Sequence, residues 1–458
     1  MTERIESAFD YHAAVSYRRG ALGGGGLDWS MRPETDRRYE DCSTLALPEP
    51  LAEAGPSDPA RLSALLAASC GVSAVARTPA GSFFYRSAPS AGALYPIELF
   101  LAGRPWGFEP GVYHYAPERH ALQRLAPLAS GRGLSLLLAA EFFRSGWKYR
   151  QRAYRYCLLD AGHVLENILC ALDALGAARR SRLDFDDAAA ARLCGLAPGR
   201  ESALAWVAAG EDLPDELPEA AGTVPAGLPC APRVGDLPLV QAADALCAEA
   251  APGQGEASGP DVLSARAEDW IPLEPAAMPV GRDFFAAVIA RRSRRDYRKA
   301  LLAPADLGAL AASLRLEDPL PELGAGVLLP GGGEIAAGLY ALDAAGCRLG
   351  RLLEGVLHRC AAAACLDQGW LADAGALFVF AADLEALEAR LGPRGYRHAL
   401  IRAGRLGQRL YLAATARGLG ACGIGAFYDD EAAALLGLRG GQRLLYLVAV
   451  GEITGSAG

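Results

Sequence analysis

Four segments of the sequence combine residue types that could bind a cofactor or move a proton. The first is RRSRRDY, residues 291–297, which follows the apolar run FFAAVIA. A helix that ends on two or three guanidiniums and one hydroxyl suits a phosphate, because arginine forks match phosphate oxygens and serine adds a short hydrogen bond. A solvated basic patch is the alternative interpretation of these residues.

The second and third segments are rich in small residues. RSAPSAGALYPIELFLAG, residues 86–103, begins as a tight loop that lets backbone groups approach a flat ligand, and it continues as an apolar strand. GLGACGIGAFYDD, residues 418–430, follows a predicted helix and lets backbone amides face an anion or an electron-rich ring atom. It lacks the spacing of a dinucleotide-binding fingerprint. Each segment, taken alone, is also compatible with a purely structural loop.

The fourth segment is SGWKYRQRAYRY, residues 145–156, in which the amine of Lys148 stands next to the phenol of Tyr149. Either group could shuttle a proton if desolvation and neighbouring cations lower its pKa. The charged start of a helix is the alternative interpretation of this segment.

The elements that must position these segments occur twice in the chain. RAYRYCLLDAGHVLENILCALDALG begins at Arg152 and RGYRHALIRAGRLGQRLYLAATARGLG begins at Arg394, an offset of 394 − 152 = 242 residues. Both place apolar residues at helical spacing, and both precede an Asp-Asp pair and an apolar strand that closes on Gly-Glu. Upstream, GVYHYAPERHALQRL resembles GLYALDAAGCRLGRL. The sequence therefore predicts one ancestral α+β unit present twice.

Between the two copies the composition changes to Pro, Gly, Ala and acidic residues, which is typical of a linker. We therefore expect an N-terminal domain over residues 1–212, a linker over 213–280 and a C-terminal domain over 281–458. A βαβ crossover array is disfavoured, because the strand signals cluster apart from the long helical runs.

Length and composition exclude several classes of protein. A chain of 458 residues with 52% hydrophobic and 21% charged residues can bury a large core. Its net charge of -8 argues against nucleic acid or an anionic membrane as partner. Eleven cysteines without a CxxC pair indicate buried thiols in a reducing cytoplasm, and six scattered histidines form no metal-binding pattern. No signal peptide or membrane-spanning run is recognisable, so we expect a cytoplasmic protein without a metal.

Together, the four segments resemble the nitroreductase superfamily of flavin enzymes, and specifically the SagB/ThcOx-type branch of azoline dehydrogenases from ribosomal peptide heterocycle pathways. The resemblance covers nearly the whole chain outside the predicted linker. PSAGALYP followed by WKY, YRY and GH is specific to that branch, whereas RRSxR is common to the superfamily. The residues that carry it are Arg291, Ser293 and Arg295, PSAGALYP at 89–96, Lys148-Tyr149, the YRYxLLDAGH segment and GLGACGIGAF.

The resemblance implies an α+β protein of two tandem three-layer α-β-α domains that form an intrachain pseudo-dimer, with FMN bound at the interface of the domains. It implies that the FMN phosphate is held by Arg291, Ser293 and Arg295. The ring would lie near Gly423, Ile424 and Gly425, and it would be covered by Pro89, Ser90, Ala91, Gly92 and Leu94.

The motifs are divided between the two copies. The N-terminal copy has PSAGALYP and Lys148-Tyr149, but it has AVSYR at 14–18 in place of RxSxR and GAARRSRLDF in place of the glycine loop. The C-terminal copy keeps RxSxR and the glycine loop, but it has LPGGGEI at 329–335 in place of PSAGALYP and Arg390-Leu391 in place of Lys-Tyr. We therefore expect one complete flavin site, one vestigial site and one FMN per chain.

By the same resemblance, the expected reaction is oxidation of a thiazoline or oxazoline ring in a peptide to the aromatic azole, with reoxidation of the flavin by oxygen. Lys148 would be the catalytic base and Tyr149 its partner, while backbone amides of residues 423–425 would stabilise charge on the reduced ring. The substrate would be a ribosomal or carrier-bound peptide, and the partner a cyclodehydratase or an assembly-line protein. No leader-binding module is recognisable before Tyr11, which favours substrate recognition by that partner.

Three alternatives stay open at this point. An NAD(P)H-dependent nitro or quinone reductase would use the same flavin pocket without needing the Lys-Tyr pair. A non-catalytic, flavin-binding docking subunit of a peptide-modifying complex would explain why each copy has lost motifs. An oxidase that acts on a cyclic dipeptide at Cα–Cβ would use the same residues on another substrate.

Overall fold

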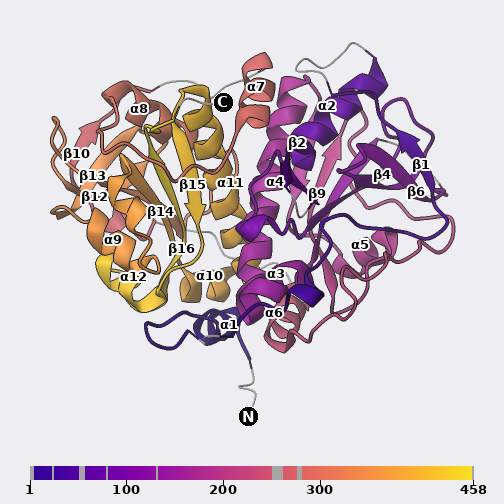
Figure 1. Cartoon of the computed structure of the whole chain (residues 1–458), viewed down its shortest axis with the longest axis horizontal. Helices are drawn as coiled ribbons and strands as arrows, with labels where there is room; N and C mark the ends of the chain where they lie inside the picture. Colours follow the sequence, from indigo (N-terminus) through magenta and orange to yellow (C-terminus); the bar gives the residue numbers. More distant parts are fainter. Residues whose placement is uncertain are drawn as a thin grey trace. The chain divides into compact units, whose positions relative to one another are not determined.

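A computed structural model of the chain describes residues 5–22, 25–50, 57–78, 81–129, 133–249, 261–275 and 281–455. The contacts divide the chain into two compact units. Unit 1 comprises Met1–Gly25, Glu249–Pro279 and Arg291–Gly458, and unit 2 comprises Gly26–Ala248 and Val280–Ala290. Each unit contains the sheet of one copy of the repeat (Figure 1).

Unit 2 is built on an antiparallel sheet whose seven described strands have the order β1-β6-β5-β4-β7-β9-β8. The strands are β1 (Ser43–Ala46), β4 (Ile97–Gly103), β5 (Gly111–Ala116), β6 (Ala121–Ala126), β7 (Leu134–Glu141), β8 (Arg179–Arg182) and β9 (Glu201–Ala209). A separate hairpin consists of β2 (Val72–Thr78) and β3 (Gly81–Arg86). The helices are α2 (Asp58–Cys70), α3 (Phe142–Tyr149), α4 (Ala153–Ala174), α5 (Asp187–Cys194), α6 (Pro238–Glu249), α7 (Arg282–Ala290), and the short η1 (Trp29–Met31), η2 (Ala91–Ala93) and η3 (Arg150–Arg152).

Helices cover both faces of the unit 2 sheet. Because successive side chains of a strand point to opposite faces, Leu137 and Ala139 of β7 enter the same core as Leu193 and Cys194 of α5. The opposite face packs against α4, whose 22 residues are nearly all buried. These three layers confirm the α-β-α architecture predicted for the N-terminal copy.

Unit 1 has an antiparallel sheet of seven described strands in the order β10-β13-β12-β11-β14-β16-β15. The strands are β10 (Glu268–Pro272), β11 (Leu323–Leu329), β12 (Gly338–Asp343), β13 (Arg348–Glu354), β14 (Ala376–Asp383), β15 (Gly420–Ile424) and β16 (Gln442–Gly451). The helices are α1 (Ala8–Ala14), α8 (Pro304–Ser313), α9 (His358–Ala364), α10 (Leu384–Leu391), α11 (Arg394–Ala416), α12 (Asp429–Leu435), and the short η4 (Ser264–Arg266) and η5 (Gly369–Asp373).

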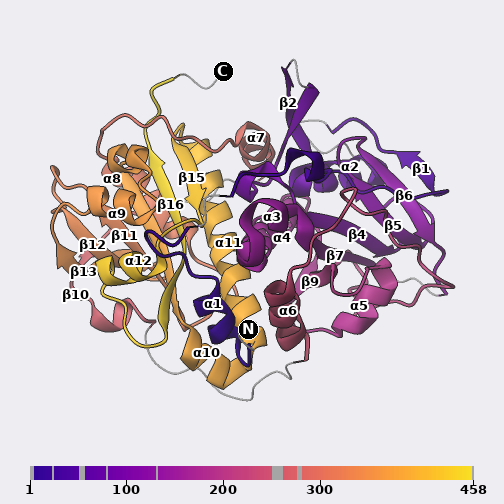
Figure 2. The ribbon, with the colours of Figure 1, turned by 60° about the horizontal axis from the view of Figure 1, so that its bottom comes forward.

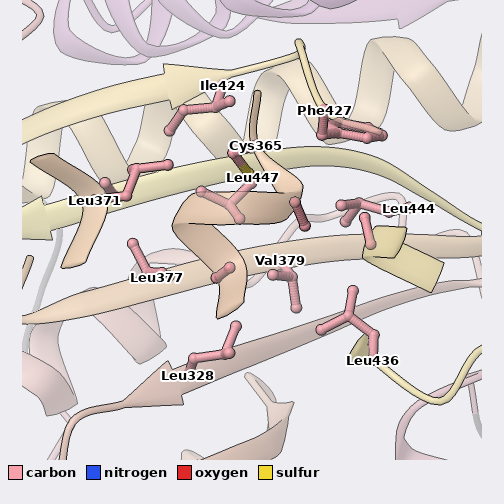
Figure 3. Close-up of a cluster of buried hydrophobic side chains, with 14 of the residues drawn as sticks. Leu328, Cys365, Leu371, Leu377, Val379, Ile424, Phe427, Leu436, Leu444 and Leu447 are labelled. Carbon is pink, nitrogen blue, oxygen red and sulfur yellow. The ribbon is translucent and has the colours of Figure 1, made fainter. Parts of the chain in front are cut away.

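The core of unit 1 follows the same alternation. Leu377 and Val379 of β14 and Leu447 of β16 pack with Cys365, which follows α9, and Leu436, which follows α12, on one face of the sheet (Figure 3). On the other face, α11 packs along β15 and β16. Unit 1 is therefore also a three-layer α-β-α domain.

The two sheets repeat each other in detail. The strand orders correspond one to one, and a bulge between β7 and β9 at Leu138/Ala139 recurs between β14 and β16 at Phe380/Ala381. The spacing of these bulges, 380 − 138 = 242, equals the offset found in the sequence. Further upstream the offset differs, because the chain between β13 and β14 contains α9 and η5, for which the N-terminal copy has no described counterpart. The predicted tandem α+β fold is thus confirmed.

The first helix of each sequence copy packs in the unit that contains the sheet of the other copy: α1 belongs to unit 1 and α7 to unit 2. In unit 1, the backbone N–H groups of Ala8 and Phe9 at the start of α1 donate to the Glu388 carboxylate of α10 at 3.1 and 3.2 Å (Figure 2). In unit 2, α7 packs against α2 and α4. The predicted boundaries at residues 212 and 280 follow the repeat in the sequence and stay a prediction, whereas the compact units are divided at other residues.

The described part of the predicted linker is folded. The N–H of Leu228 donates to the carbonyl of Arg38 at 2.9 Å, and the N–H of Glu34 donates to the carbonyl of Cys230 at 2.7 Å, so this stretch lies along unit 2. Helix α6 follows, and β10 pairs with β13 in unit 1. Residues 250–260 and 276–280 of the predicted linker lie outside the described residues.

Two further features of the structure concern membrane spanning and metal binding. Among the residues that the structure describes, no helix has the length and apolar character needed to cross a membrane. Within the same ranges, no group of three or more His, Cys, Asp or Glu side chains is placed to hold a metal ion.

Candidate active site

A strained loop connects β3 to β4 in unit 2. Gly92, Ala93 and Tyr95 have positive φ angles of 65, 52 and 46°. Alanine and tyrosine rarely adopt this conformation, which costs about 1 to 3 kcal/mol per residue and persists only where the surroundings fix the backbone. Strain of this kind is concentrated at active sites, so the loop is a candidate for ligand contact.

Two buried residues support the strained backbone at Tyr95. Arg144 of α3 donates from Nη1 to the carbonyl of Tyr95 at 2.9 Å, and its guanidinium lies 2.5 Å from the Glu98 carboxylate. Burial alone would raise the pKa of Glu98, but the charge of Arg144 and a hydrogen bond from His114 hold that pKa well below its ordinary value. The ionised pair therefore keeps Arg144 in place beneath the loop.

Asp160 of α4 holds the first half of the loop. The Ser90 hydroxyl donates to its Oδ2 at 2.5 Å and the Ala91 N–H donates to its Oδ1 at 3.3 Å. Burial raises the pKa of Asp160 to about 7, although both hydrogen bonds lower it. Asp160 was not among the site residues expected from the sequence. Its signal was a lone carboxylate in the apolar helical run CLLDAGH, since a buried charge requires specific partners.

The Lys-Tyr pair lies at the end of α3, the helix that directly follows β7. The helix ends there because Arg150, with a φ of 52° and a ψ of -134°, leaves the helical conformation. Lys148 is exposed and its Nζ lies 5.4 Å from the centre of the Tyr149 ring, while that half-buried ring packs on Tyr156 at 4.2 Å between centroids. The arrangement presents an amine to solvent beside a phenol whose ring is fixed.

The structure brings the loop and the Lys-Tyr pair together. A methyl group placed on Gly92 would lie 2.9 Å from the Tyr149 hydroxyl and 3.2 Å from both Cδ and Nζ of Lys148. Only glycine therefore fits at this position, on account of both its φ and its neighbours. Two motifs that are separate in the sequence thus form one cluster in unit 2.

A small apolar cluster fixes α3 against the loop. Leu94 packs with Phe143, Trp147 and Cys230, so the side chain of Leu94 is buried among protein atoms. Leu237, which directly precedes α6, lies against Gly146, where a β-carbon would come 2.5 Å from its Cδ1. The stretch predicted as a linker therefore helps to position the helix that carries Lys148.

In unit 1, the predicted phosphate motif lies beside the glycine loop. Ser293 forms a parallel bridge with Ala421 of β15, and the N–H of Arg294 donates to the carbonyl of Ala421 at 2.9 Å. The buried Tyr411 hydroxyl links the two segments, because it lies 2.9 Å from the Ser293 hydroxyl and accepts the N–H of Gly423 at 2.7 Å. Burial raises the pKa of Tyr411, so the phenol stays protonated and can serve both groups.

The three side chains of the motif differ in exposure. Arg291 is buried with its guanidinium 5.3 Å from the centre of the Tyr411 ring, whereas Ser293 and Arg295 are exposed. Burial raises the pKa of the Cys422 thiol on β15 and Arg295 opposes this effect, which places Arg295 close to the glycine loop. Two guanidiniums and a hydroxyl around one strand edge fit a phosphate-bearing cofactor.

Packing within unit 1 constrains the glycine loop, and its place near a flavin ring stays a prediction. Ile424 points into the unit 1 core (Figure 3), and a β-carbon on Gly423 would overlap the Tyr446 hydroxyl. Gly423 is therefore required by packing within the unit, whether or not a ligand approaches it. Gly425 follows β15, where the backbone leaves the sheet.

Loss of the exposed phosphate-motif side chains should weaken FMN binding. We expect Arg295→Ala to raise the Kd for FMN about tenfold to a hundredfold, because a hydrogen bond to a charged group contributes about 1.5 to 3 kcal/mol. Ser293→Ala should raise the Kd about tenfold for the same reason. Quenching of FMN fluorescence on titration measures both values. Arg298→Ala, an exposed arginine of the same segment, is the control, and equal effects in all three variants would contradict the assignment.

The second set of motif positions is occupied by other side chains. The offset of 242 places Ser181 and Arg182 of β8 where β15 has Gly423 and Ile424, and Arg182 packs 4.8 Å from the centre of the Trp206 ring. At the counterpart of Lys148, Arg390 of α10 forms an ion pair with Glu322. The vestigial second site stays a prediction that these substitutions support.

Comparison with known proteins bears on the identity of the chain. A model of the Nitroreductase family matches residues 334–452. MJ1384 of Methanocaldococcus jannaschii, named as a nitroreductase, is 33% identical over 108 residues, which are 20% of this chain and 54% of that protein. The crystal structure of a nitroreductase-like protein from Anabaena variabilis aligns with a TM-score of 0.82 and 26% identity, over 98% of this chain and 100% of that one. Residues 334–452 thus match the Nitroreductase family, and the whole chain has the fold of the Anabaena variabilis protein.

A second relative within the superfamily concerns peptide processing. The microcin B17-processing protein McbC of Escherichia coli is 30% identical over 132 residues, which are 24% of this chain and 48% of McbC. The chain thus spans about half of the length of each of these two curated relatives. These matches confirm the resemblance to the nitroreductase superfamily and to its peptide-processing branch.

Proposed function

We propose that the chain is an FMN-dependent oxidoreductase that oxidises azoline rings of a peptide to azoles. The observation that carries the proposal is the cluster of Gly92, Lys148 and Tyr149, in which a strained loop lies against an exposed amine and a phenol. A reductase that only passes electrons from a nucleotide to a nitro group or a quinone does not need this pair.

The relatives support the peptide substrate and an oxidoreductase activity. McbC is a processing protein for microcin B17. The Lys-Tyr motif is among the residues by which this chain resembles the azoline dehydrogenase branch. We also propose that a partner protein delivers the peptide to this chain and that the chain acts in the cytoplasm.

The chemistry that we propose removes two hydrogen atoms from the ring. The Cα–H leaves as a proton and the adjacent C–H leaves as a hydride, so the ring loses two electrons and gains a double bond. When bound, FMN supplies the hydride acceptor, and oxygen then takes up the electrons. Lys148 removes the Cα proton through Nζ, and the Tyr149 hydroxyl next to it orients the amine. The loop at Gly92 keeps both groups at a fixed distance from the ligand.

The division of the motifs leads us to propose that each chain binds one FMN, and that oxidation requires the phosphate motif of unit 1 as well as the loop and the Lys-Tyr pair of unit 2. Unit 1 would hold the phosphate through Arg291, Ser293 and Arg295, and unit 2 would supply the loop and the Lys-Tyr pair. The structural counterpart of each motif in the other unit has other side chains, as described above for Arg182 and Arg390.

The test of the proposal uses the full chain loaded with FMN and a peptide that carries a single thiazoline. We expect conversion to the thiazole, seen by mass spectrometry as loss of two hydrogen atoms, with one O2 molecule consumed and one hydrogen peroxide formed per ring. Rapid reduction of nitro compounds by NADPH without azoline oxidation would replace the proposal by the reductase alternative. Absence of flavin binding would favour the docking subunit.

A further inference from the structure

The hydrogen bonds around Asp160 form a closed chain that fixes the first half of the strained loop. Asp160 accepts the Ser90 hydroxyl at 2.5 Å and the Ala91 N–H at 3.3 Å, and the Ser90 oxygen in turn accepts the N–H of Tyr95 at 3.0 Å. The carboxylate thus binds the two residues before Gly92, and the Ser90 hydroxyl links it to Tyr95, which follows Gly92. An ionised carboxylate can accept both bonds at once, since it has two acceptor oxygens.

The surroundings of Asp160 keep it out of solvent. Its side chain is 5% exposed and it borders a cavity of about 10 Å³, which holds at most one water molecule. Arg86 of β3, Cys70 of α2 and Tyr95 line the same cavity, and Cys157 and His163 lie one turn away on α4. The Arg86 guanidinium is directed elsewhere, because it donates to the Thr35 carbonyl at 2.5 Å and stacks on the Tyr95 ring at 4.8 Å.

We propose that Asp160 is a positioning residue of the proposed oxidation, which in its ionised form holds the 89–95 loop so that Gly92 stays against Lys148 and Tyr149. Asp160 does not touch the reacting ring; it acts through the loop. The inference rests on the proposed function for its kinetic part, whereas the coupling between the carboxylate and the loop can be measured without any substrate.

The direction of the pH dependence follows from the hydrogen bonds. A protonated Asp160 has lost one acceptor oxygen to its own O–H, so the Ser90 hydroxyl loses a charge-assisted bond and the loop is held less firmly. Because burial raises the pKa of Asp160 to about 7, this loosening occurs as the pH falls through neutrality. Asparagine is neutral at every pH and mimics the protonated acid.

The free energy of unfolding should change with pH in the direction opposite to the rigidity of the loop. The pKa of Asp160 is raised from an ordinary 3.8 to about 7, so the folded chain binds more protons than the unfolded chain between these values. Ionisation of Asp160 therefore lowers the free energy of unfolding as the pH rises from about 4 to about 7. Asp160→Asn removes this loss, so its Tm relative to that of the wild type should rise with pH in the same window.

The substrate-free test is hydrogen exchange of the 88–96 segment in the full chain, about one pH unit below and above neutrality, corrected for intrinsic exchange rates. We expect protection of the wild-type segment to fall about tenfold or more at the lower pH, and Asp160→Asn to show the low protection at both. Asp173→Asn, an exposed aspartate of the same helix, is the control. Wild-type protection that does not change with pH would overturn the proposal.

The kinetic test compares kcat for azoline oxidation by the wild type and by Asp160→Asn across pH, because the ratio of the two values cancels the titration of all other groups. The ratio should fall about tenfold per pH unit below about 7, since only the wild type loses an ionised carboxylate at position 160. If Asp160→Asn fails to fold, Ser90→Ala leaves the carboxylate in place and should replace it as the reference in the same ratio. A ratio that does not change with pH in a folded Asp160→Asn would refute the positioning role. If hydrogen exchange depends on Asp160 as expected but the chain does not oxidise azolines, the coupling of Asp160 to the loop stands and the proposed function is refuted.

Discussion

Lys148→Ala is expected to lower kcat for azoline oxidation by about a hundredfold or more, because general base catalysis by a positioned side chain contributes about 10² to 10⁴ in rate. The Kd for FMN should stay unchanged, since Lys148 is exposed at the end of α3 and the phosphate motif belongs to unit 1. Single-turnover reduction of the bound flavin by a thiazoline peptide measures the step directly.

The composition of the chain supplies a sharp set of controls for this variant. The sequence contains two lysines, Lys148 and Lys299, against 43 arginines among its 45 basic residues. Lys148→Arg keeps the positive charge but removes the titratable amine, so it should be nearly as inactive as the alanine variant. Lys299→Ala, an exposed lysine of unit 1, should retain full activity. Full turnover by Lys148→Ala would exclude Lys148 as the base and favour the reductase.

Gly92→Ala is the second variant with a large expected effect. The new methyl group would meet the Tyr149 hydroxyl at 2.9 Å and Lys148 at 3.2 Å, at a φ of 65° that alanine adopts only with strain. We expect kcat to fall about a hundredfold, because a displacement of about 1 Å in a catalytic group costs that much. Steady-state kinetics with the thiazoline peptide report displacement of the catalytic groups, and thermal unfolding of the same preparation reports backbone strain.

Gly176→Ala is the matched control for backbone strain. Gly176, in the turn after α4, has the same φ of 65°, but no atom lies within 4 Å of the position that a methyl group would take. Both variants should lose about 1 to 2 kcal/mol of stability through the left-handed conformation of alanine. Only Gly92→Ala should also lose activity. Equal activity in the two variants would mean that Gly92 does not position the Lys-Tyr pair.

The repeat could be predicted from the sequence because it is a local property. Helical spacing in the segments that became α4 and α11, and apolar strands that became β9 and β16, depend on neighbours within one element. The offset of 242 residues also matches the bulge positions on β7 and β14, because no net insertion separates these strands from α4 and α11. The motifs RRSRR, PSAGALYP and WKY could be recognised for the same reason, since each is a run of neighbouring residues.

Long-range contacts could not be predicted in this way. The exchange of α1 and α7 depends on contacts such as that between Ala8 and Glu388, which are 380 residues apart. The folding of the predicted linker depends on backbone pairing of Leu228 with Arg38. Composition indicates only that such a segment is poor in regular structure, and it carries no information on the surface against which the segment packs.

The roles of single residues in the site could likewise be predicted only where they depend on neighbouring residues in the sequence. The role of Asp160 depends on the position of Ser90, which is 70 residues away, so the sequence showed only an isolated carboxylate. Gly423 was expected near a flavin ring, yet its small size is already required by the Tyr446 hydroxyl. A glycine pattern indicates close approach but does not name the group that approaches.

The central proposal is that each chain binds one FMN, because the flavin motifs are divided between the two copies of the repeat. The most direct measurement is the visible spectrum of the purified full chain after incubation with excess FMN and removal of the unbound cofactor, with the released FMN counted against chain concentration. The account predicts one FMN per chain, lost in Arg295→Ala at the same dilution. Two FMN per chain, or none, would contradict it.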